Sequence, residues 1–175
     1  GECAEARAGV PGRKMGLGGG VDTPTTTGSV WGEGEASMNG VVGCGGTITG
    51  GAVRGVDGMT NAGLKGLAGR LCVGHAHVVP VNWGCEVQVF GQRVEPGQLI
   101  HADKHGFLAI PPGEEKGLLD AAVFMDENEC NTIIKTARGA SGLTRTELLK
   151  QLNQSVTDFG EAARNKFGSP GEFGD

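Results

Sequence analysis

The sequence contains no tyrosine, and aromatic residues make up only 5% of its 175 positions. It also lacks any run of 18 apolar residues, which excludes a membrane-spanning helix of ordinary length. Lysines and arginines are scattered among acidic residues, and the formal net charge is −5. Because nucleic-acid-binding surfaces need clustered positive charge, we expect no nucleic-acid partner, and we expect no membrane partner either.

Closely spaced cysteine pairs are also missing. The cysteines are odd in number and none are spaced C-x-x-C, which argues against a disulfide framework or a zinc knuckle. They are Cys3, Cys44, Cys72, Cys85 and Cys130. Scattered thiols of this kind are usually small buried apolar residues. The first residues show no signal-peptide pattern, so the expected location is the reducing cytoplasm.

Glycine is the residue present in excess. There are 34 glycines, and 18 of them fall within the first 58 residues. Their irregular spacing excludes collagen. Each glycine inside a helix or strand costs about 0.5–1 kcal/mol relative to alanine. Either this half of the chain is unusually loose, or some glycines stand for unidentified residues, which a mass different from 17.8 kDa would reveal.

The hydrophobic pattern predicts alternating elements in the first 81 residues. We expect a loop over 21–30, a helix entered through Gly32–Met38 and ended by Gly43, a strand over 44–49, a helix or helical turn over 57–71 and a strand over 72–81. The residues that follow, 86–110, predict short strands joined by tight turns. In that run we expect Gly91-Gln92 to form a type II′ turn, followed by turns at Pro96-Gly97 and Asp103–Gly106.

After Pro112 the apolar spacing becomes helical. We expect a first helix broken near Asp126 and a second helix opened by a capping box formed by Thr144 and Glu147. The order of helix, strands and then helices predicts an α/β or α+β layered sandwich in one domain with tails.

Few side chains suggest chemistry. Arg54 follows a short apolar strand and a glycine-rich turn, and its planar guanidinium suits a carboxylate or phosphate; a surface salt bridge is the alternative. His75 and His77 share one face of a predicted strand, where two histidines can ligate a metal, but we favour half-buried strand residues. Asp103 lies between two histidines and is interpreted as a turn residue. The G-x-S-x-G, H-E-x-x-H and Walker A motifs are absent.

Three stretches together resemble a known family. They are Trp31-Gly32-Glu33, Gly50-Gly51-Ala52-Val53-Arg54, and the longer run from Pro96-Gly97-Gln98 to Ile110-Pro111. This pattern is similar to the RraA-like family, which includes 4-hydroxy-4-methyl-2-oxoglutarate aldolases, oxaloacetate decarboxylases and regulators of ribonuclease activity. The resemblance covers roughly residues 21–140. We therefore divide the chain into a poorly matched segment 1–20, a catalytic-type domain 21–140, and a C-terminal helix and tail 141–175.

The resemblance implies an α/β fold, an αββαβ sandwich of the swivelling phosphohistidine-domain type with C-terminal helices. It implies a homotrimer or hexamer with sites between subunits, a small α-keto-acid substrate and a Mg²⁺ or Mn²⁺ ion. Arg54 would clamp the substrate carboxylate, and Glu33 would hold metal-bound water or assist proton transfer. Backbone N–H groups of Gly32–Glu35, a stretch that includes Gly34, would add donors for the anion. Glu129 is a candidate acid reaching a neighbouring subunit.

The chain departs from the family at two positions. The family has Asp, a direct metal ligand, where this chain has Gly55, and often another acid where it has Gly58. Three functions therefore remain: a metal-dependent lyase that needs Asp at 55, a non-catalytic protein-binding regulator favoured if Gly55 is genuine, and an unrelated domain. A misread Asp at 55 remains open, because glycine also replaces expected bulky residues at 34, 45 and 66.

Overall fold

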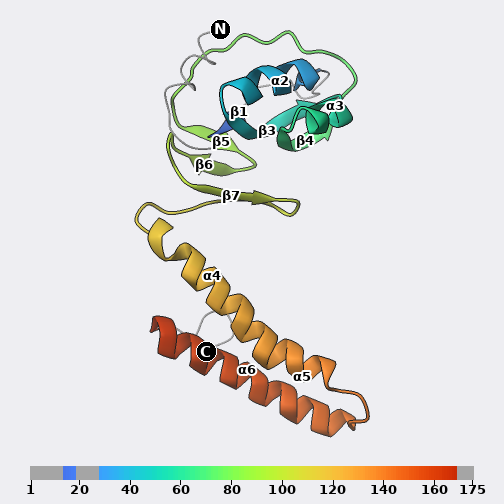
Figure 1. Cartoon of the computed structure of the whole chain (residues 1–175), viewed down its shortest axis with the longest axis vertical. Helices are drawn as coiled ribbons and strands as arrows, with labels where there is room; N and C mark the ends of the chain where they lie inside the picture. Colours follow the sequence, from blue (N-terminus) through green and yellow to red (C-terminus); the bar gives the residue numbers. More distant parts are fainter. Residues whose placement is uncertain (1–13, 19–27, 169–175) are drawn as a thin grey trace. The chain divides into compact units, whose positions relative to one another are not determined.

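The computed structural model of the chain describes residues 14–18 and 28–168 (Figure 1). The expectations for residues 1–13 and for 21–27 lie outside the described residues. The chain divides into two units, residues 1–111 and 112–175, which are described separately below. The domain boundaries expected at 20/21 and 140/141 remain predictions.

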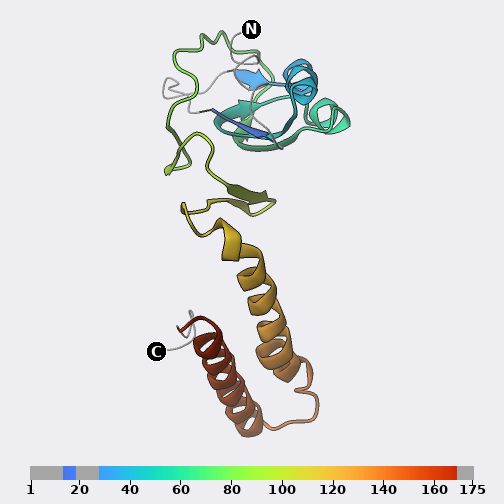
Figure 2. The same ribbon diagram turned by 60° about the vertical axis from the view of Figure 1, so that its left-hand side comes forward.

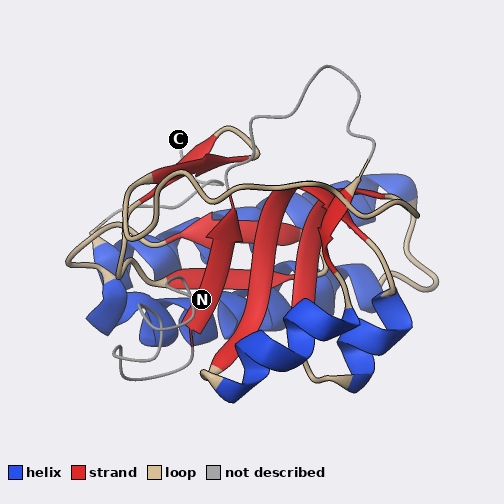
Figure 3. Cartoon of the chain, turned by 90° about the horizontal axis from the view of Figure 1, so that it is seen from above, coloured by secondary structure: helices blue, strands red, loops and turns tan. Residues whose placement is uncertain are grey.

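The first unit is organised around strand β3 (Cys44–Val53). Strands β1 (Lys14–Gly18) and β2 (Ser29–Trp31) pair in parallel with its first and last residues, and β4 (Lys65–Leu71) pairs in parallel along its other edge. Because β3 has neighbours on both edges, its residues are largely buried, and Ile48 is fully so. Seen from above, these strands lie side by side (Figure 3).

Two helices follow the ends of two parallel strands. Helix α2 (Glu33–Val41) begins directly after β2, and α3 (Val56–Asn61) begins just after β3. They lie next to each other beside the sheet (Figures 1 and 2). The helix predicted after Gly32 is therefore confirmed. The buried core between helices and sheet consists of Trp31, Ala36, Cys44, Val53, Met59 and Leu64.

Gly50 and Gly51 form an irregularity within β3 and do not end the strand. The pairing register shifts between Thr49 and Ala52, and the Gly51 N–H donates to Thr49 Oγ1 at 3.1 Å. The strand predicted to stop at Thr49 thus continues to Val53. On β4, a Cβ at Gly69 would lie 2.6 Å from the Gly50 carbonyl oxygen, so the bulge also requires glycine on the neighbouring strand.

Two elements predicted between residues 57 and 81 are wrong. The loop predicted over 21–30 also extends too far at its C-terminal end. The helix predicted over 57–71 ends at Asn61, because Gly63 takes φ +78° and residues 65–71 pair with β3 instead. The strand predicted over 72–81 is reduced to one isolated bridge between Ser29 and His75. Residues 29 and 30, placed at the end of the loop predicted over 21–30, belong to β2 (Ser29–Trp31). At residues 29–31 and 65–71, tertiary pairing with β3 overrides the local pattern, whereas residues 72–81 gain only that one bridge among the described residues.

Two short hairpins complete this unit. In β5 (Val87–Val89) and β6 (Gln92–Val94), the central turn residues are Phe90 and Gly91, with φ of 49° and 80°. Positive φ at both residues indicates type I′, so the predicted II′ turn at Gly91-Gln92 is shifted by one residue. The hairpin of β7 (Ile100–Asp103) and β8 (Gly106–Ala109) is confirmed.

The second unit is a helical hairpin (Figure 2). Helix α4 (Glu115–Glu129) runs on through a π-helical segment η1 (Cys130–Ile134) into α5 (Lys135–Arg138), and α6 (Arg145–Phe167) returns beside it. The break expected at Asp126 is wrong, because the irregularity comes only at Cys130. The capping box of Thr144 and Glu147 is confirmed. No helix among the described residues is long and apolar enough to cross a membrane.

Candidate functional site

Arg54 is held at the edge of the sheet where two strands end. Its backbone N–H donates to the carbonyl oxygen of Trp31 at 3.0 Å, which joins the ends of β3 and β2. Because these strands are parallel, their carboxyl ends meet at one edge, and the loops that follow them lie together. In open α/β sheets, this edge is where ligands usually bind.

The Arg54 side chain lies against Gly32, the residue between β2 and α2. A Cβ at Gly32 would lie 3.6 Å from Arg54 Cγ, 3.7 Å from Nε and 3.8 Å from Cζ. Arg54 is exposed, and its guanidinium makes no ion pair within the part of the chain that the structure describes. The fork of N–H donors is therefore available for an anion, and the salt-bridge alternative is not what the structure shows.

Helix α2 begins beside this guanidinium. The Ala36 N–H makes the first helical bond to the Gly32 carbonyl, at 2.9 Å, so the amides before Ala36 have no partner within the helix. These are the N–H groups that the sequence predicted as anion donors. Gly34 is exposed and has open space around it, whereas Glu35 is half-buried. The first turn of α2 thus presents backbone donors next to Arg54.

The Glu33 side chain lies against the first turn of α3. A Cβ at Gly58 would lie 2.7 Å from the Glu33 Oε2 atom and 2.8 Å from Glu33 Cβ. The Glu33 carboxylate accepts no hydrogen bond from the described residues. The structure therefore brings Glu33, Arg54, Gly55 and Gly58 to one edge of the sheet, and Glu33 and Arg54 form no ion pair there among the described residues.

Gly55 begins α3 in the left-handed conformation, with φ 58° and ψ 46°. A Cβ at this position would meet only the Glu33 backbone nitrogen, at 3.9 Å, so there is room for a side chain. Asp is among the residues that tolerate this conformation. An aspartate here would begin beside the first residue of α2, where glycine offers no side-chain ligand.

The carboxylates present do not fit a divalent metal. Mg²⁺ and Mn²⁺ prefer several oxygen ligands, yet no three His, Cys, Asp or Glu side chains within residues 14–18 and 28–168 are placed to hold an ion together. Glu33 is the acidic side chain that lies against Gly58 at this edge of the sheet. Glu129 belongs to the helical unit, where it is exposed at the end of α4, and its role remains a prediction.

The histidine-containing segments do not form a metal site among the described residues. His75 is exposed, and its Nδ1 lies 2.7 Å from the Ala76 carbonyl oxygen. In the β7–β8 turn, the His105 N–H donates to Asp103 Oδ1 at 2.7 Å. The pKa of Asp103 is lowered below its ordinary value, with this backbone hydrogen bond as the largest cause and the hydrogen bond from the His105 side chain as the second. The interpretation of Asp103 as a turn residue is confirmed.

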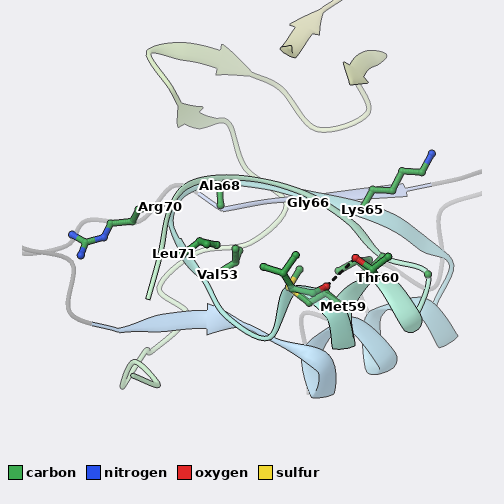
Figure 4. Close-up of a pocket in the computed structure, with 11 residues that line it drawn as sticks. Val53, Met59, Thr60, Lys65, Gly66, Ala68, Arg70 and Leu71 are labelled. Carbon is green, nitrogen blue, oxygen red and sulfur yellow. Dashed lines mark hydrogen bonds between the residues drawn. The ribbon is translucent and has the colours of Figure 1, made fainter. Parts of the chain in front are cut away.

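The sequence did not reveal a hollow that borders the site. It has a volume of about 480 Å³ and lies between α3 and β4, with Val53, Met59, Leu64 and Leu71 among its lining residues. Val53 and Leu71 point into it, whereas Lys65 and Arg70 extend outward from opposite ends of β4 (Figure 4). The hollow was missed because residues 57–71 were predicted as one helix. The residues 65–71, of which three are apolar, carry no period-2 pattern that would have predicted the strand.

Known proteins resemble this chain in sequence pattern and in fold. A structure search matches the crystal structure of Streptomyces coelicolor RraAS2, described as an unusual member of the RNase ES inhibitor RraA protein family, with a TM-score of 0.52 and 18% identity. The match covers 61% of this chain and 55% of that one, so this chain spans about half the length of its structural neighbour. No curated protein sequence matches.

The structural likeness supports the fold, which is the predicted mixed α/β architecture with C-terminal helices. The sequence evidence for the family is separate from it. The family model RraA-like, described as Aldolase/RraA, matches residues 19–109, a range of 91 of the 175 residues that contains β2 to β8 and the whole Arg54 site. The protein therefore belongs to the RraA-like family.

Proposed function

We propose that the chain binds the carboxylate of a small α-keto acid at Arg54. The observation that carries this proposal is the guanidinium of Arg54, which lies against Gly32 at the start of α2 and has no ion-pair partner among the described residues. A bidentate guanidinium and helix-start amides are the donors that carboxylates prefer. The ligand would be small, because the loops after β2 and β3 bring only a few donors together.

With an aspartate at residue 55, the reaction that we propose for this site is lyase chemistry, either cleavage of a pyruvate-type aldol or decarboxylation of oxaloacetate. Arg54 and the α2 amides would fix the orientation of the keto acid, and Glu33 would accept or deliver a proton. Glu33 and an aspartate at residue 55 would be the side chains available to hold a Mg²⁺ or Mn²⁺ ion, which would supply Lewis-acid chemistry when bound. The donors present do not fit such an ion, so the chain with Gly55 would bind the keto acid and lack the metal-dependent step.

A second candidate function follows from the glycines at 55 and 58. With glycine at both 55 and 58, the site keeps its carboxylate clamp but has lost the side chains that the family uses around the metal. A non-catalytic protein that binds another protein, on the same scaffold, needs no metal ligand. This candidate predicts a stable protein partner and no turnover, and a pull-down that returns no partner counts against it.

Self-association is also part of the proposal. Val73, Val79 and Val81 are 96%, 83% and 82% exposed in the segment that follows β4, and Trp83 is half exposed. Monomeric proteins rarely leave such a run of apolar side chains in water. It supports the expected trimer or hexamer, and a cytoplasmic location remains our expectation. Sedimentation velocity of the full chain tests the assembly.

The deciding experiment compares the protein with a Gly55→Asp variant. Oxalate or pyruvate binding is measured by calorimetry, and pyruvate release from oxaloacetate and from a 4-hydroxy-2-oxo acid is measured with and without Mg²⁺ or Mn²⁺. Arg54→Gln and an enzyme-free blank are the controls, since metals alone decarboxylate oxaloacetate. We expect binding by both proteins and turnover by the Gly55→Asp variant. If neither binds oxalate in an Arg54-dependent way, the α-keto-acid proposal fails.

If the unchanged protein turns over substrate with metal, the site is complete despite Gly55, and the second candidate is excluded. If both proteins bind oxalate and neither turns over, the second candidate is favoured.

A further inference from the structure

The space beside Gly58 decides where the Glu33 carboxylate goes. Glu33 Oε2 lies 2.7 Å from the position that a Cβ at residue 58 would occupy, and Glu33 Cβ lies 2.8 Å from it. Real Cβ atoms do not approach other atoms this closely, so the observed position of Glu33 and any side chain at 58 exclude each other. Gly58 has no positive φ, so its backbone does not require glycine.

Glu33 has an obvious alternative partner. The Arg54 side chain lies against Gly32, the residue directly before Glu33, and it is exposed and unpaired among the described residues. An acid and an arginine so close in space are expected to attract each other. In the structure they form no ion pair, because Glu33 is turned onto α3 at Gly58.

We propose that Gly58 is a positioning residue that holds Glu33 off Arg54 and so keeps the guanidinium free for the incoming carboxylate. This inference rests on the proposed function of the Arg54 site. A side chain at 58 would push Glu33 out, and the charge on Arg54 would draw it into an ion pair. The pair would then compete with the ligand.

The test uses the full chain and oxalate as the probe. We expect Gly58→Ala to weaken oxalate binding about two- to fivefold, which is the range that an exposed ion pair can impose on a competitor. The weakening should be absent when Glu33→Gln is combined with Gly58→Ala, because the neutral amide does not compete for Arg54. Gly40→Ala is the matched control: Gly40 is also a helical glycine of α2, but it lies outside the anion-binding turn, and the nearest atom to its added Cβ is the Ala62 carbonyl oxygen, at 3.9 Å.

Two outcomes would overturn the inference and leave the proposed function intact. One is that Gly58→Ala weakens binding equally with Glu33 present and in the Glu33→Gln background, and the other is that Gly58→Ala causes no weakening. A protein that fails to bind oxalate at all would sink the proposed function. In that event the Arg54 Nε–H resonance still tests whether Gly58 sets the position of Glu33, because this resonance should shift in Gly58→Ala and not in Gly40→Ala.

The Glu33→Gln variant alone gives a second measurement if Gly58→Ala does not fold. Because Glu33 already lies off Arg54, the Arg54 Nε–H resonance of this variant should stay where it is in the parent. A clear shift of that resonance on loss of the carboxylate would mean that Glu33 already pairs with Arg54, which contradicts the inference.

Discussion

The backbone of Arg54 donates a hydrogen bond to the carbonyl oxygen of Trp31 at 3.0 Å. This bond joins the last residue of β2 to the residue that follows β3. The two side chains have different roles. Trp31 lies in the buried core, and Arg54 is exposed to solvent. The arginine therefore has a rigid base, which is what a residue that orients a ligand requires.

Replacing Arg54 by lysine tests whether the fork geometry matters. We expect oxalate affinity to fall roughly tenfold, because lysine keeps the charge and loses the bidentate hydrogen bonds. The measurement is titration calorimetry at low salt. Arg93→Lys is the matched control, since Arg93 is also exposed and lies 3.5 Å from Glu86 outside the site. Equal affinities for Arg54→Lys and the parent would contradict a bidentate clamp.

The bulge in β3 predicts that Gly69 is sensitive to a single methyl group. A Cβ at Gly69 would lie 2.6 Å from the Gly50 carbonyl oxygen, which is backbone and cannot rotate away. We expect Gly69→Ala to lower the free energy of unfolding by about 1–3 kcal/mol. Urea denaturation followed by circular dichroism measures it.

Gly117→Ala provides the control for that substitution. Gly117 lies in α4 with no atom within 4 Å of an added Cβ. Alanine there should be neutral or stabilise the helix by about 0.5–1 kcal/mol. If both alanines have the same effect, the close approach at Gly69 is not what constrains that position.

The capping box at the start of α6 predicts a measurable loss in the helical unit. The Glu147 N–H donates to Thr144 Oγ1 at 3.3 Å, and the Thr144 N–H donates to Glu147 Oε2 at 2.9 Å. Thr144→Ala should cost about 1 kcal/mol. Thr157→Ala, in the exposed middle of α6, removes a hydroxyl that only bonds back to Asn153 and should change stability far less. Thermal denaturation of the two variants should therefore differ.

The Asp103 turn predicts an acid-side pH dependence. The His105 backbone N–H is the largest cause that lowers the pKa of Asp103, and the His105 side chain comes second. A carboxyl whose folded pKa is depressed stabilises the fold above its unfolded pKa, near 3.9, and this contribution is lost as the pH falls through the folded value. In His105→Ala, the Asp103 carboxyl resonance should still show a lowered pKa, because the backbone N–H of residue 105 remains. A return to the ordinary pKa would show that the side chain dominates.

The sequence predicted the elements that local chemistry determines. The capping box at Thr144, the turn at Asp103 and the helix after Gly32 all depend on residues within a few positions of one another. It failed where pairing between distant residues decides the structure. Residues 65–71 were assigned to a helix from their leucines, yet parallel pairing with β3 makes them a strand. The contact of Glu33 with Gly58 could not be predicted from the sequence either, because it depends on the distance between α2 and α3.

Residue 55 gives the last prediction, because the structure separates glycines that are required from glycines that are merely present. Gly28 and Gly69 have backbone atoms 2.6 Å from an added Cβ, so these positions should be glycine in the natural protein. Gly34 has open space and no positive φ, so nothing in its surroundings requires glycine. Gly55 has room for a Cβ, but its φ of 58° favours glycine, and aspartate is among the few other residues enriched in that conformation. If some glycines stand for other residues, we expect them at the open positions.

Peptide mass spectrometry of the segment around residue 55 measures this directly. A mass that requires Asp at 55 would restore the missing carboxylate beside Glu33, and the metal-dependent lyase would become the favoured function. A mass that fits glycine, together with an intact mass of 17.8 kDa, would establish a site that has its carboxylate clamp and lacks the side-chain metal ligand. The substitution of a side chain for a required glycine, such as Gly69, would contradict the packing on which the distinction depends.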